Sequence, residues 1–397
     1  MSQRLDRYAA RNANVVLVTS DCVAVPPREA RQEIPPTSQA LRRISRGGAP
    51  RLVTFAGALT AALVLTVPAQ APLGAQAGVP ASAGPRTPWG DPDLQGNYTN
   101  LWEAGTPFER PDEFAGRRLE DIKGDELAAI RRGIQERTRT EQLAGDIGGS
   151  RWIWLDSHNH AKGSMAWFVI DPPDGKIPPL TPEARARQSA RVEARKRSGR
   201  GPADSYTDRS LYDRCISRGV PGSMMPAIYG NSYDIVQAPG YVVIRYEMIH
   251  EARVIPLGGS PHLPESLRSY MGDARGHWEG DTLVVETTNI RPEIAYRGSN
   301  AATLKLTERF TRVAPDKVRW AITVDDPSTW TRPWTFAMPL TQDENEQLVP
   351  YECHEGNYAM TNILSGARAE EAAAAEDAKR GIVRPRPNAA AETEQER

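Results

Sequence analysis

The chain has 397 residues, of which 39% are hydrophobic and 25% charged, and its formal net charge at pH 7 is -1. This balance argues against a nucleic-acid-binding protein, which needs a basic surface, and against a strongly acidic, solvating surface. Glycine (32) and proline (33) are both frequent, which favours turns and short elements over long helices. The composition is ordinary for a globular protein of one large domain or two.

An apolar segment near the N-terminus predicts export. The run from Leu52 to Val67 carries no charge, and Ala75 to Ala77 forms an A-x-A cleavage pattern. The run follows four arginines, Arg42, Arg43, Arg46 and Arg51. We therefore predict a signal peptide at residues 52–77 and a periplasmic or secreted protein without a stable membrane span after cleavage. The alternative is an uncleaved anchor, although so short an apolar core is thin for a spanning helix.

Residues 1–51 are much longer than the charged region that normally precedes a signal, so we interpret them as a disordered extension or as the result of a wrongly assigned start. Cysteine usage agrees with export. Cys22 lies before the signal, which leaves Cys215 and Cys353 in the mature chain. Two cysteines in an oxidising compartment predict one disulfide; the alternative is two buried free thiols.

One globular domain is predicted over residues 87–369. Helical spacing of apolar residues predicts one or two helices at 119–143, and a basic, solvated helix is predicted at 181–200. The aromatic stretch at 152–170 is predicted to form a strand pair. From Arg368 the chain is rich in Ala and Glu and then polar, so residues 370–397 are predicted to be a helix end fraying into a disordered tail.

Short runs rich in Val, Thr, Leu and Ile follow, separated by turn signals at intervals of roughly ten residues. The predicted strands are Ser232 to Val236, Gly240 to Met248, Ala252 to Pro256, Thr282 to Asn289, Ala302 to Val313, Lys317 to Val324 and Trp334 to Leu340. In the fifth run Leu304, Leu306, Glu308 and Phe310 alternate onto one face. We therefore predict a mainly β fold, an antiparallel up-and-down barrel of lipocalin-like type with helical insertions.

The stretch Arg275-Gly-His-Trp-Glu-Gly-Asp-Thr-Leu-Val-Val285 resembles a signature of an uncharacterised family of secreted bacterial proteins of the soil acidobacterial and sphingomonad type. Other matching pieces are Asp91 to Gly96, Asp171 to Pro179, Asp208 to Cys215, Pro221 to Met224, Glu247 to His250 and Cys353 to Tyr358. The resemblance covers about Thr87 to Ala369. It implies export and a barrel, and it assigns no catalytic residue.

The sequence lacks the common hydrolase, nucleotide and metalloprotease motifs: G-x-S-x-G, the P-loop, H-E-x-x-H, C-x-x-C and a G-x-G-x-x-G that opens a helix after a strand. Titratable residues do cluster near predicted strand ends, with Glu247 and His250 in one segment and Asp273, Arg275 and His277 in the next. A histidine beside a carboxylate can take and return a proton near neutral pH, so these five are the candidate catalytic residues. The alternative is that they tie turns to the sheet.

Candidate substrate-binding residues lie further along the chain. Trp330 and Trp334 flank a turn and are predicted at a pocket rim, where Arg332 would hold an anionic group. His354, beside Cys353, is predicted at the mouth of the barrel; the structural alternative is an ordinary strand residue. The histidines are scattered rather than spaced as ligands, so we predict no metal and no cofactor.

Three functions fit this pattern. The first is an exported enzyme whose barrel pocket performs acid-base chemistry, such as lyase, isomerase or hydrolase action, on a small, partly hydrophobic molecule. The second is a non-catalytic periplasmic carrier or sensor of an apolar ligand, which needs the same pocket without proton chemistry. The third is a cell-envelope interaction protein that uses the helical insertions. The first is the main hypothesis, with a small molecule as partner.

Overall fold

The computed structural model describes residues 84–143, 162–227, 229–343, 348–349 and 351–382. The predicted signal peptide, the extension before it and the last residues of the predicted tail lie outside this range, as does most of the predicted strand pair at 152–170. None of the helices described is both apolar enough and long enough to span a membrane.

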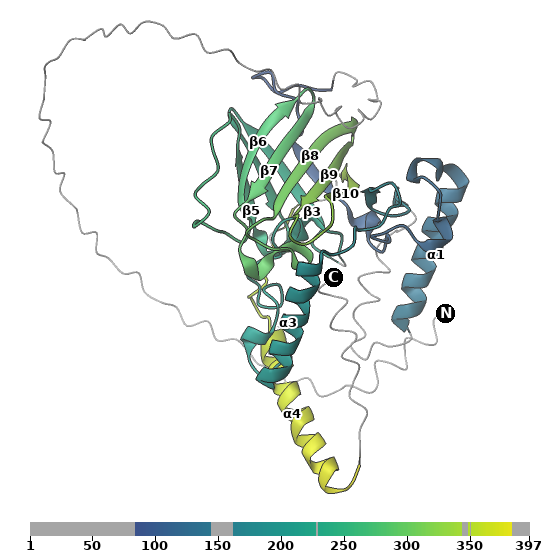
Figure 1. Cartoon of the computed structure of the whole chain (residues 1–397). Helices are drawn as coiled ribbons and strands as arrows, with labels where there is room; N and C mark the ends of the chain where they lie inside the picture. Colours follow the sequence, from purple (N-terminus) through teal and green to yellow (C-terminus); the bar gives the residue numbers. More distant parts are fainter. Residues whose placement is uncertain (1–83, 144–161, 228, 344–347, 350, 383–397) are drawn as a thin grey trace, which may run out of the picture. The chain divides into compact units, whose positions relative to one another are not determined.

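The described residues form one large antiparallel sheet that curls into a nearly closed barrel (Figure 1). Its strands are β1 (Gly96–Thr99), β2 (Val169–Asp171), β3 (Ser232–Ala238), β4 (Tyr241–Tyr246), β5 (Ala252–Pro256), β6 (Asp273–Glu279), β7 (Thr282–Thr288), β8 (Lys305–Ala314), β9 (Lys317–Asp325) and β10 (Trp334–Gln342). Nine of them follow in the order β5-β4-β3-β1-β10-β9-β8-β7-β6, and β2 pairs with β10 beside this path. The predicted fold class, a mainly β antiparallel barrel with helices, is confirmed.

Chain order explains where the barrel closes. Within β3–β5, and again within β6–β10, strands that follow one another in the chain are antiparallel neighbours in the sheet. Strand β1 joins the two groups, because it pairs antiparallel with both β3 and β10. A ring with an odd number of strands cannot be antiparallel at every junction. The exception lies between β5 and β6, where Leu257 and Gly276 form an isolated parallel bridge. Gly276 permits this approach, because a Cβ there would lie 2.7 Å from Leu257 Cδ2.

Side chains from the inner faces of the strands fill the barrel. The predicted inward face of β8 is confirmed, since Leu306, Glu308 and Phe310 are fully buried and alternate with more exposed residues. Large buried side chains from other strands complete this core, among them Tyr98, Tyr233, Tyr246, Trp320, Trp334 and Phe336. The interior is therefore a packed core, as expected for small barrels.

Among the described residues, three α-helices accompany the sheet: α1 (Gly124–Leu143), α3 (Pro182–Ser198) and α4 (Ala359–Lys379). The first two confirm the helices predicted at 119–143 and 181–200. Thr181 caps α3 by accepting a hydrogen bond from the Ala184 N–H at 3.0 Å. Helix α4 begins before, and continues past, residue 370, where the sequence predicted a disordered tail.

The sequence did not predict strand β6, nor β1. Strand β6 reads Asp-Ala-Arg-Gly-His-Trp-Glu, a composition with few β-favouring residues. It is ordered by pairing with β7, from Asp273 opposite Thr288 to Glu279 opposite Thr282. Asp273, Arg275 and His277, which were predicted near strand ends, therefore lie along a strand.

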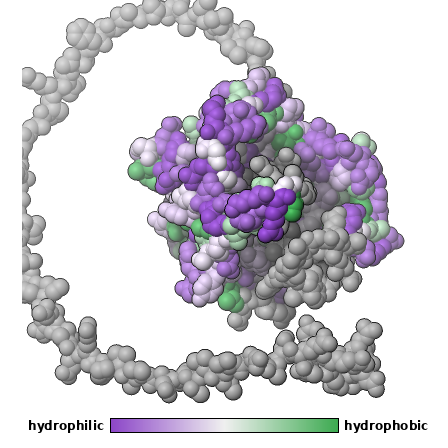
Figure 2. Space-filling view, turned by 90° about the horizontal axis from the view of Figure 1, so that it is seen from below, coloured by the Kyte–Doolittle hydropathy of each residue, from purple (hydrophilic) through white to green (hydrophobic). Residues whose placement is uncertain are grey.

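The view from below shows hydrophilic side chains over most of the described surface, with hydrophobic residues only in scattered spots (Figure 2). Such a face does not offer the large contiguous apolar patch that marks a stable protein interface.

Candidate functional site

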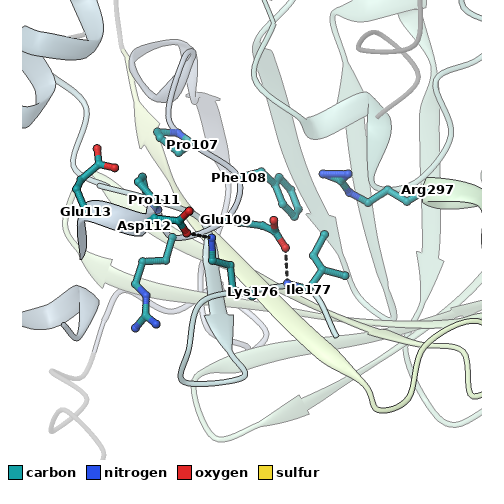
Figure 3. Close-up of a pocket in the computed structure, with 10 residues that line it drawn as sticks. Pro107, Phe108, Glu109, Pro111, Asp112, Glu113, Lys176, Ile177 and Arg297 are labelled. Atoms are coloured by element: carbon teal, nitrogen blue, oxygen red, sulfur yellow. Dashed lines mark hydrogen bonds and ion pairs between the residues drawn. The ribbon is translucent and has the colours of Figure 1, made fainter. Parts of the chain in front are cut away.

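A cavity of about 600 Å³ lies beside the start of β10 (Figure 3). It is lined by Pro107, Phe108, Glu109, Arg110, Pro111, Asp112, Glu113, Lys176, Ile177 and Arg297. We call it the Arg297 pocket. Its volume is within the range of small-molecule sites. The lining residues come from segments that are distant in the chain. The Phe108 carbonyl accepts hydrogen bonds from the N–H groups of Phe168 and Val169, which holds the Phe108 segment beside the start of β2.

Aromatic residues form the wall of the pocket and the core beneath it. The Phe108 ring lies 5.9 Å from Trp334 and 5.1 Å from Phe336, measured between centroids. Tyr296 stacks on Trp334 at 6.3 Å, and Trp330 meets the same ring edge-on at 5.5 Å. Trp330 and Trp334 were predicted at a pocket rim, but they are 3% and 0% exposed. Both residues therefore lie in the core beneath the pocket wall, where their indole rings bury a large apolar area.

Arg297 is the most unusual residue of the pocket. It belongs to the short helical turn Tyr296–Gly298, yet its φ is +50°, in the left-handed region that few non-glycine residues adopt. Its guanidinium carbon lies 4.2 Å above the centre of the Phe108 ring, a cation–π geometry. Its Nε is buried without a hydrogen-bond partner, and no carboxylate of the described residues forms an ion pair with it. The side chain is therefore a fixed cation with unused donor capacity.

Tyr296 lies next to this cation in the chain and beneath it in space. Burial raises the pKa of Tyr296 to about 12, and the neighbouring Arg297 only partly offsets this effect. The phenol therefore stays neutral at physiological pH. It presents an apolar ring and no competing negative charge to the Arg297 guanidinium, whose carbon lies 5.8 Å from the ring centre.

Two of the three acidic residues that line the pocket, Glu109 and Asp112, have partners in its wall. Glu109 accepts a hydrogen bond from the Ile177 N–H at 2.5 Å, and Asp112 pairs with Lys176 at 2.9 Å (Figure 3). The Lys176 hydrogen bond lowers the pKa of Asp112, which keeps this carboxylate ionised and occupied. Among the described residues none of these carboxylates forms an ion pair with Arg297.

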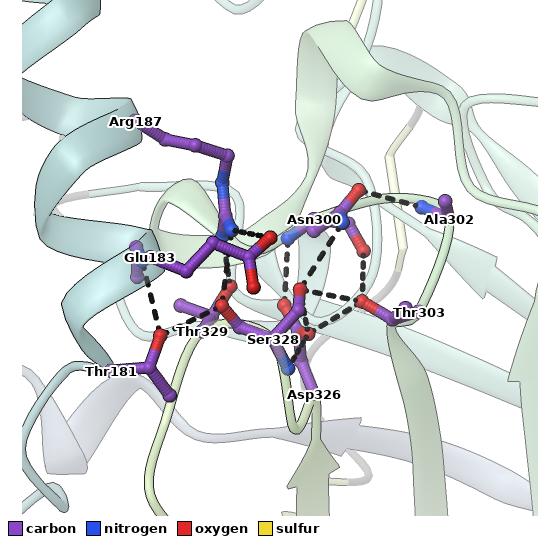
Figure 4. Close-up of polar contacts among 10 residues, drawn as sticks. Thr181, Glu183, Arg187, Asn300, Ala302, Thr303, Asp326, Ser328 and Thr329 are labelled. Carbon is purple, nitrogen blue, oxygen red and sulfur yellow. Dashed lines mark hydrogen bonds and ion pairs between the residues drawn. The ribbon is translucent and has the colours of Figure 1, made fainter.

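A buried polar network holds the segment that follows Arg297 (Figure 4). Asp326, at the end of β9, accepts hydrogen bonds from the Asn300 N–H at 2.7 Å, from the Thr303 hydroxyl at 2.6 Å and from Ser328. Burial alone would raise the pKa of Asp326, but hydrogen bonds from Thr303, Thr329, Asn300 and Ser328 outweigh it and lower the pKa. A saturated carboxylate of this kind fixes backbone geometry.

The same turn anchors the opposite wall. The Thr181 N–H donates to the Thr329 carbonyl at 2.9 Å, and Arg187 on α3 donates to the Thr329 hydroxyl at 2.7 Å. Thr181 follows closely on Ile177, which lines the pocket. The turn after β9 therefore holds both the Arg297 segment and the Ile177 segment, so that the pocket is built before a ligand arrives.

The candidate catalytic residues lie elsewhere, in separate contacts. His250 has a half-exposed side chain; its Nδ1 lies 3.2 Å from the Tyr351 carbonyl and 3.6 Å from the Glu352 carboxylate. Glu247 accepts a hydrogen bond from the Ser232 N–H at 3.1 Å. The neighbouring Glu251 has a pKa raised by burial, although hydrogen bonds from Ser217 and Ser223 oppose the shift.

Asp273 and Arg275 form an ion pair at 2.6 Å, and Asp273 also contacts His262 Nδ1 at 2.8 Å. Burial tends to raise the pKa of Asp273, but hydrogen bonds from the Leu263 N–H, His262 and Arg275 lower it overall. His277 lies on the outer face of β6 and contacts Glu279 at 3.2 Å. No hydrogen bond or ion pair within the described part of the chain joins His250 to Asp273, Arg275 or His277.

The other candidate binding residues are exposed. Arg332 forms an ion pair with Asp171 at 3.1 Å, so the Asp171 carboxylate already balances the Arg332 charge. His354 is exposed in the turn after Cys353. Cys353 and Cys215 form the predicted disulfide, with 5.6 Å between their Cα atoms. Within the described residues no group of three or more His, Cys, Asp or Glu side chains is placed to hold a metal ion.

Sequence reasoning missed Phe108 and Arg297. No motif connects them, and Arg297 stands in the unremarkable run Tyr296-Arg297-Gly298. The one signal in the sequence was Gly298, since glycine often marks a turn. In the structure Gly298 has a φ of +72° and lies in a turn near the aromatic residues. Comparison of the chain with protein-family models, with curated proteins and with solved structures found no match.

Proposed function

We propose that the protein binds a small, partly hydrophobic carboxylate in the Arg297 pocket. One observation carries this proposal: a guanidinium, held over the Phe108 ring with its Nε buried and unpartnered, faces a cavity of about 600 Å³. The guanidinium has no ion-pair partner among the described residues, so a ligand carboxylate would supply the countercharge that it lacks. Guanidinium is also well matched to a carboxylate, to which it can donate two hydrogen bonds.

The surroundings support the hydrophobic part of the ligand. Phe108 and Ile177 present apolar surface to the cavity, while Glu109 and Asp112 have partners within the wall. A molecule with an apolar ring or chain and one carboxylate would therefore place the chain on Phe108 and the charge on Arg297. This proposal develops the carrier hypothesis and moves the site from the packed barrel interior to its flank.

The test is a thermal-shift and calorimetric screen of the purified chain against benzoate, phenylacetate and hexanoate, each compared with its uncharged amide. We expect at least one carboxylate to bind and its amide to bind at least about tenfold more weakly, because a charged hydrogen bond is lost. Arg297→Gln should weaken carboxylate binding by a similar factor. Arg332→Gln is the matched control, since Arg332 is exposed and already paired with Asp171.

Two results would contradict the proposal. The first is that none of the carboxylates binds. The second is that a carboxylate binds equally well to the wild type and to Arg297→Gln while Arg332→Gln loses it. In that case the anion would be held at the exposed Arg332, just before β10, instead of in the pocket.

Acid-base enzyme activity is the second candidate function, and it is favoured by the raised pKa of Glu251. A carboxyl that stays protonated to higher pH can serve as a general acid, and such groups often mark active sites. Glu251 directly follows His250 in the chain, and the backbone of Ile249 and His250 is left-handed, with φ of +58° and +44°. Turnover lost in Glu251→Gln and in His250→Ala, but kept in His277→Ala, would support this function. Turnover that all three variants retain would exclude it.

We further propose that the protein acts outside the cytoplasm, in the periplasm or after secretion, once a signal peptide at residues 52–77 has been removed. The Cys215–Cys353 disulfide supports this location, because such bonds persist in oxidising compartments. Fractionation of cells that express the tagged full chain, with N-terminal sequencing of the product, tests it. A cytoplasmic, unprocessed product would contradict the proposal.

A further inference from the structure

A second cavity, of about 520 Å³, lies at the other end of β10. It is lined by Thr99, Asn100, Trp102, Glu103, Lys162, Ser164, Asp316, Lys317, Pro339, Thr341, Gln342 and Asp343. We call it the Trp102 pocket. Trp334, beneath the Arg297 pocket, and Gln342 are the two ends of β10. A strand of that length separates them by roughly 25 Å, so the two cavities are distinct.

The floor of the Trp102 pocket is rigid and internally satisfied. Glu103 is 3% exposed and accepts hydrogen bonds from the Ser164 N–H at 2.6 Å and from the Ser164 hydroxyl at 2.9 Å. Arg131, fully buried on α1, lies 3.7 Å from the same carboxylate and balances its charge. The Asn100 amide is likewise occupied, because it donates to the Met224 carbonyl and accepts from the Tyr233 hydroxyl. These groups shape the cavity without being available to a ligand.

The polar groups that remain available are of mixed type. Within the described residues the side chains of Asp316, Lys317 and Gln342 make no hydrogen bond or ion pair with one another or with the rest of the protein. They offer an acceptor, a charged donor and an amide that does both. Asp343 and Lys162 also line the pocket, so that its charged residues, apart from the Glu103–Arg131 pair, are two acidic and two basic, with no net charge to attract an ion.

An aromatic ring stands beside these polar groups. Trp102 lines the pocket, and the only described group over its indole is the Lys162 ammonium, 5.0 Å from the ring centre. Lys162 is exposed and makes no ion pair among the described residues, so a ligand can displace it or stack beside it. An indole favours a partner with a flat apolar or C–H-bearing face.

We infer that the Trp102 pocket binds a neutral sugar. A pyranose ring has C–H groups on one face that would stack on Trp102. Its hydroxyls both donate and accept, which matches the mixed carboxylate, ammonium and amide groups of Asp316, Lys317 and Gln342. A free anion or cation would meet as many repelling as attracting charges. The inference is independent of the carboxylate proposed for the Arg297 pocket.

The experiment is isothermal titration of the full chain with glucose, N-acetylglucosamine and cellobiose, and with glucuronate and glucosamine as charged counterparts. We expect saturable binding of at least one neutral sugar, and binding about tenfold weaker in Trp102→Ala, because the stacking surface is lost. Trp89→Ala is the matched control, since Trp89 is an exposed tryptophan outside both pockets.

Further variants keep the test decisive if Trp102→Ala does not fold. Asp316→Ala and Gln342→Ala change side chains with no partner in the described structure, so they should fold normally and weaken sugar binding several-fold. Arg297→Gln should leave sugar binding unchanged. The inference is overturned if no neutral sugar binds, if only the charged sugars bind, if the Trp102, Asp316 and Gln342 variants bind as the wild type does, or if Arg297→Gln abolishes sugar binding.

Discussion

Arg253 on β5 and Glu308 on β8 form a bidentate ion pair inside the barrel, with nitrogen–oxygen distances of 2.5 and 3.0 Å. The side chains are 3% and 0% exposed, and the Trp320 indole N–H donates to the same carboxylate at 3.1 Å. The pair spans the junction where the sheet closes, because β5 and β8 lie on opposite sides of the β5–β6 contact. It therefore links β5, one edge strand of the sheet, through the core to β8, which lies two strands in from the opposite edge strand β6.

Removing one partner of this pair should be costly. Glu308→Ala or Arg253→Ala leaves an uncompensated buried charge, so we expect a loss of about 3–5 kcal/mol in the free energy of unfolding. Replacing both with apolar residues, as in Arg253→Met with Glu308→Leu, should recover most of the loss. Urea denaturation followed by tryptophan fluorescence measures these changes.

The outer-face pair Arg309–Glu279 provides the control for that prediction. Its side chains are 44% and 49% exposed, so Arg309→Ala should cost less than about 1 kcal/mol. A loss from Glu308→Ala that is no larger than the loss from Arg309→Ala would show that the buried pair does not hold the barrel closed.

Asp326 should make stability depend on pH. Because its folded-state pKa is lowered, its stabilising effect is present above the ordinary aspartate pKa of 3.8 and is lost as the pH falls through the folded-state value. Asp326→Asn should cost about 1–3 kcal/mol at pH 7, and the difference from the wild type should shrink toward pH 3. Urea unfolding at several pH values tests this. Asp234→Asn, at a surface ion pair, is the control, and a pH-independent cost in Asp326→Asn would refute the assignment.

Gly276 should tolerate no side chain. In Gly276→Ala the new Cβ would lie 2.7 Å from Leu257 Cδ2 and 2.9 Å from Ile255 Cγ2 at the β5–β6 closure. We expect a destabilisation of about 1–3 kcal/mol. Gly366 in α4 has open space around it, so Gly366→Ala should be neutral or slightly stabilising. Equal melting temperatures for the two variants would argue that the barrel does not close at Gly276.

The disulfide should contribute to stability by restricting the unfolded chain. It closes a loop between positions 138 residues apart. We expect the double variant Cys215→Ala with Cys353→Ala to lose about 2–4 kcal/mol. Reductant should lower the melting temperature of the wild type and leave the double variant unchanged. A wild type that is indifferent to reductant would mean that this bond does not form in solution.

Local sequence patterns were enough to predict much of the β framework. Alternation along β8 predicted which residues face inward, because a strand's side chains project alternately to two sides. The helix predicted at 181–200 is α3, which Thr181 caps locally, and Cys215 with Cys353 predicted the disulfide. These features depend on neighbouring residues or on a single pairing, so one sequence suffices to predict them.

The position of the candidate site depends on contacts between distant segments, which the sequence does not reveal. Phe108 and Arg297 are far apart in the chain and meet because the β2–β10 pairing and the Asp326 network bring their segments together. Strand β6 likewise forms through its pairing with β7 rather than through its own composition. The clustered titratable residues around His250 and Asp273 looked like a site because they are close in sequence, yet their side chains project from different elements into separate contacts. Proximity along the chain reports local structure, whereas a pocket depends on which distant segments the closed sheet places side by side.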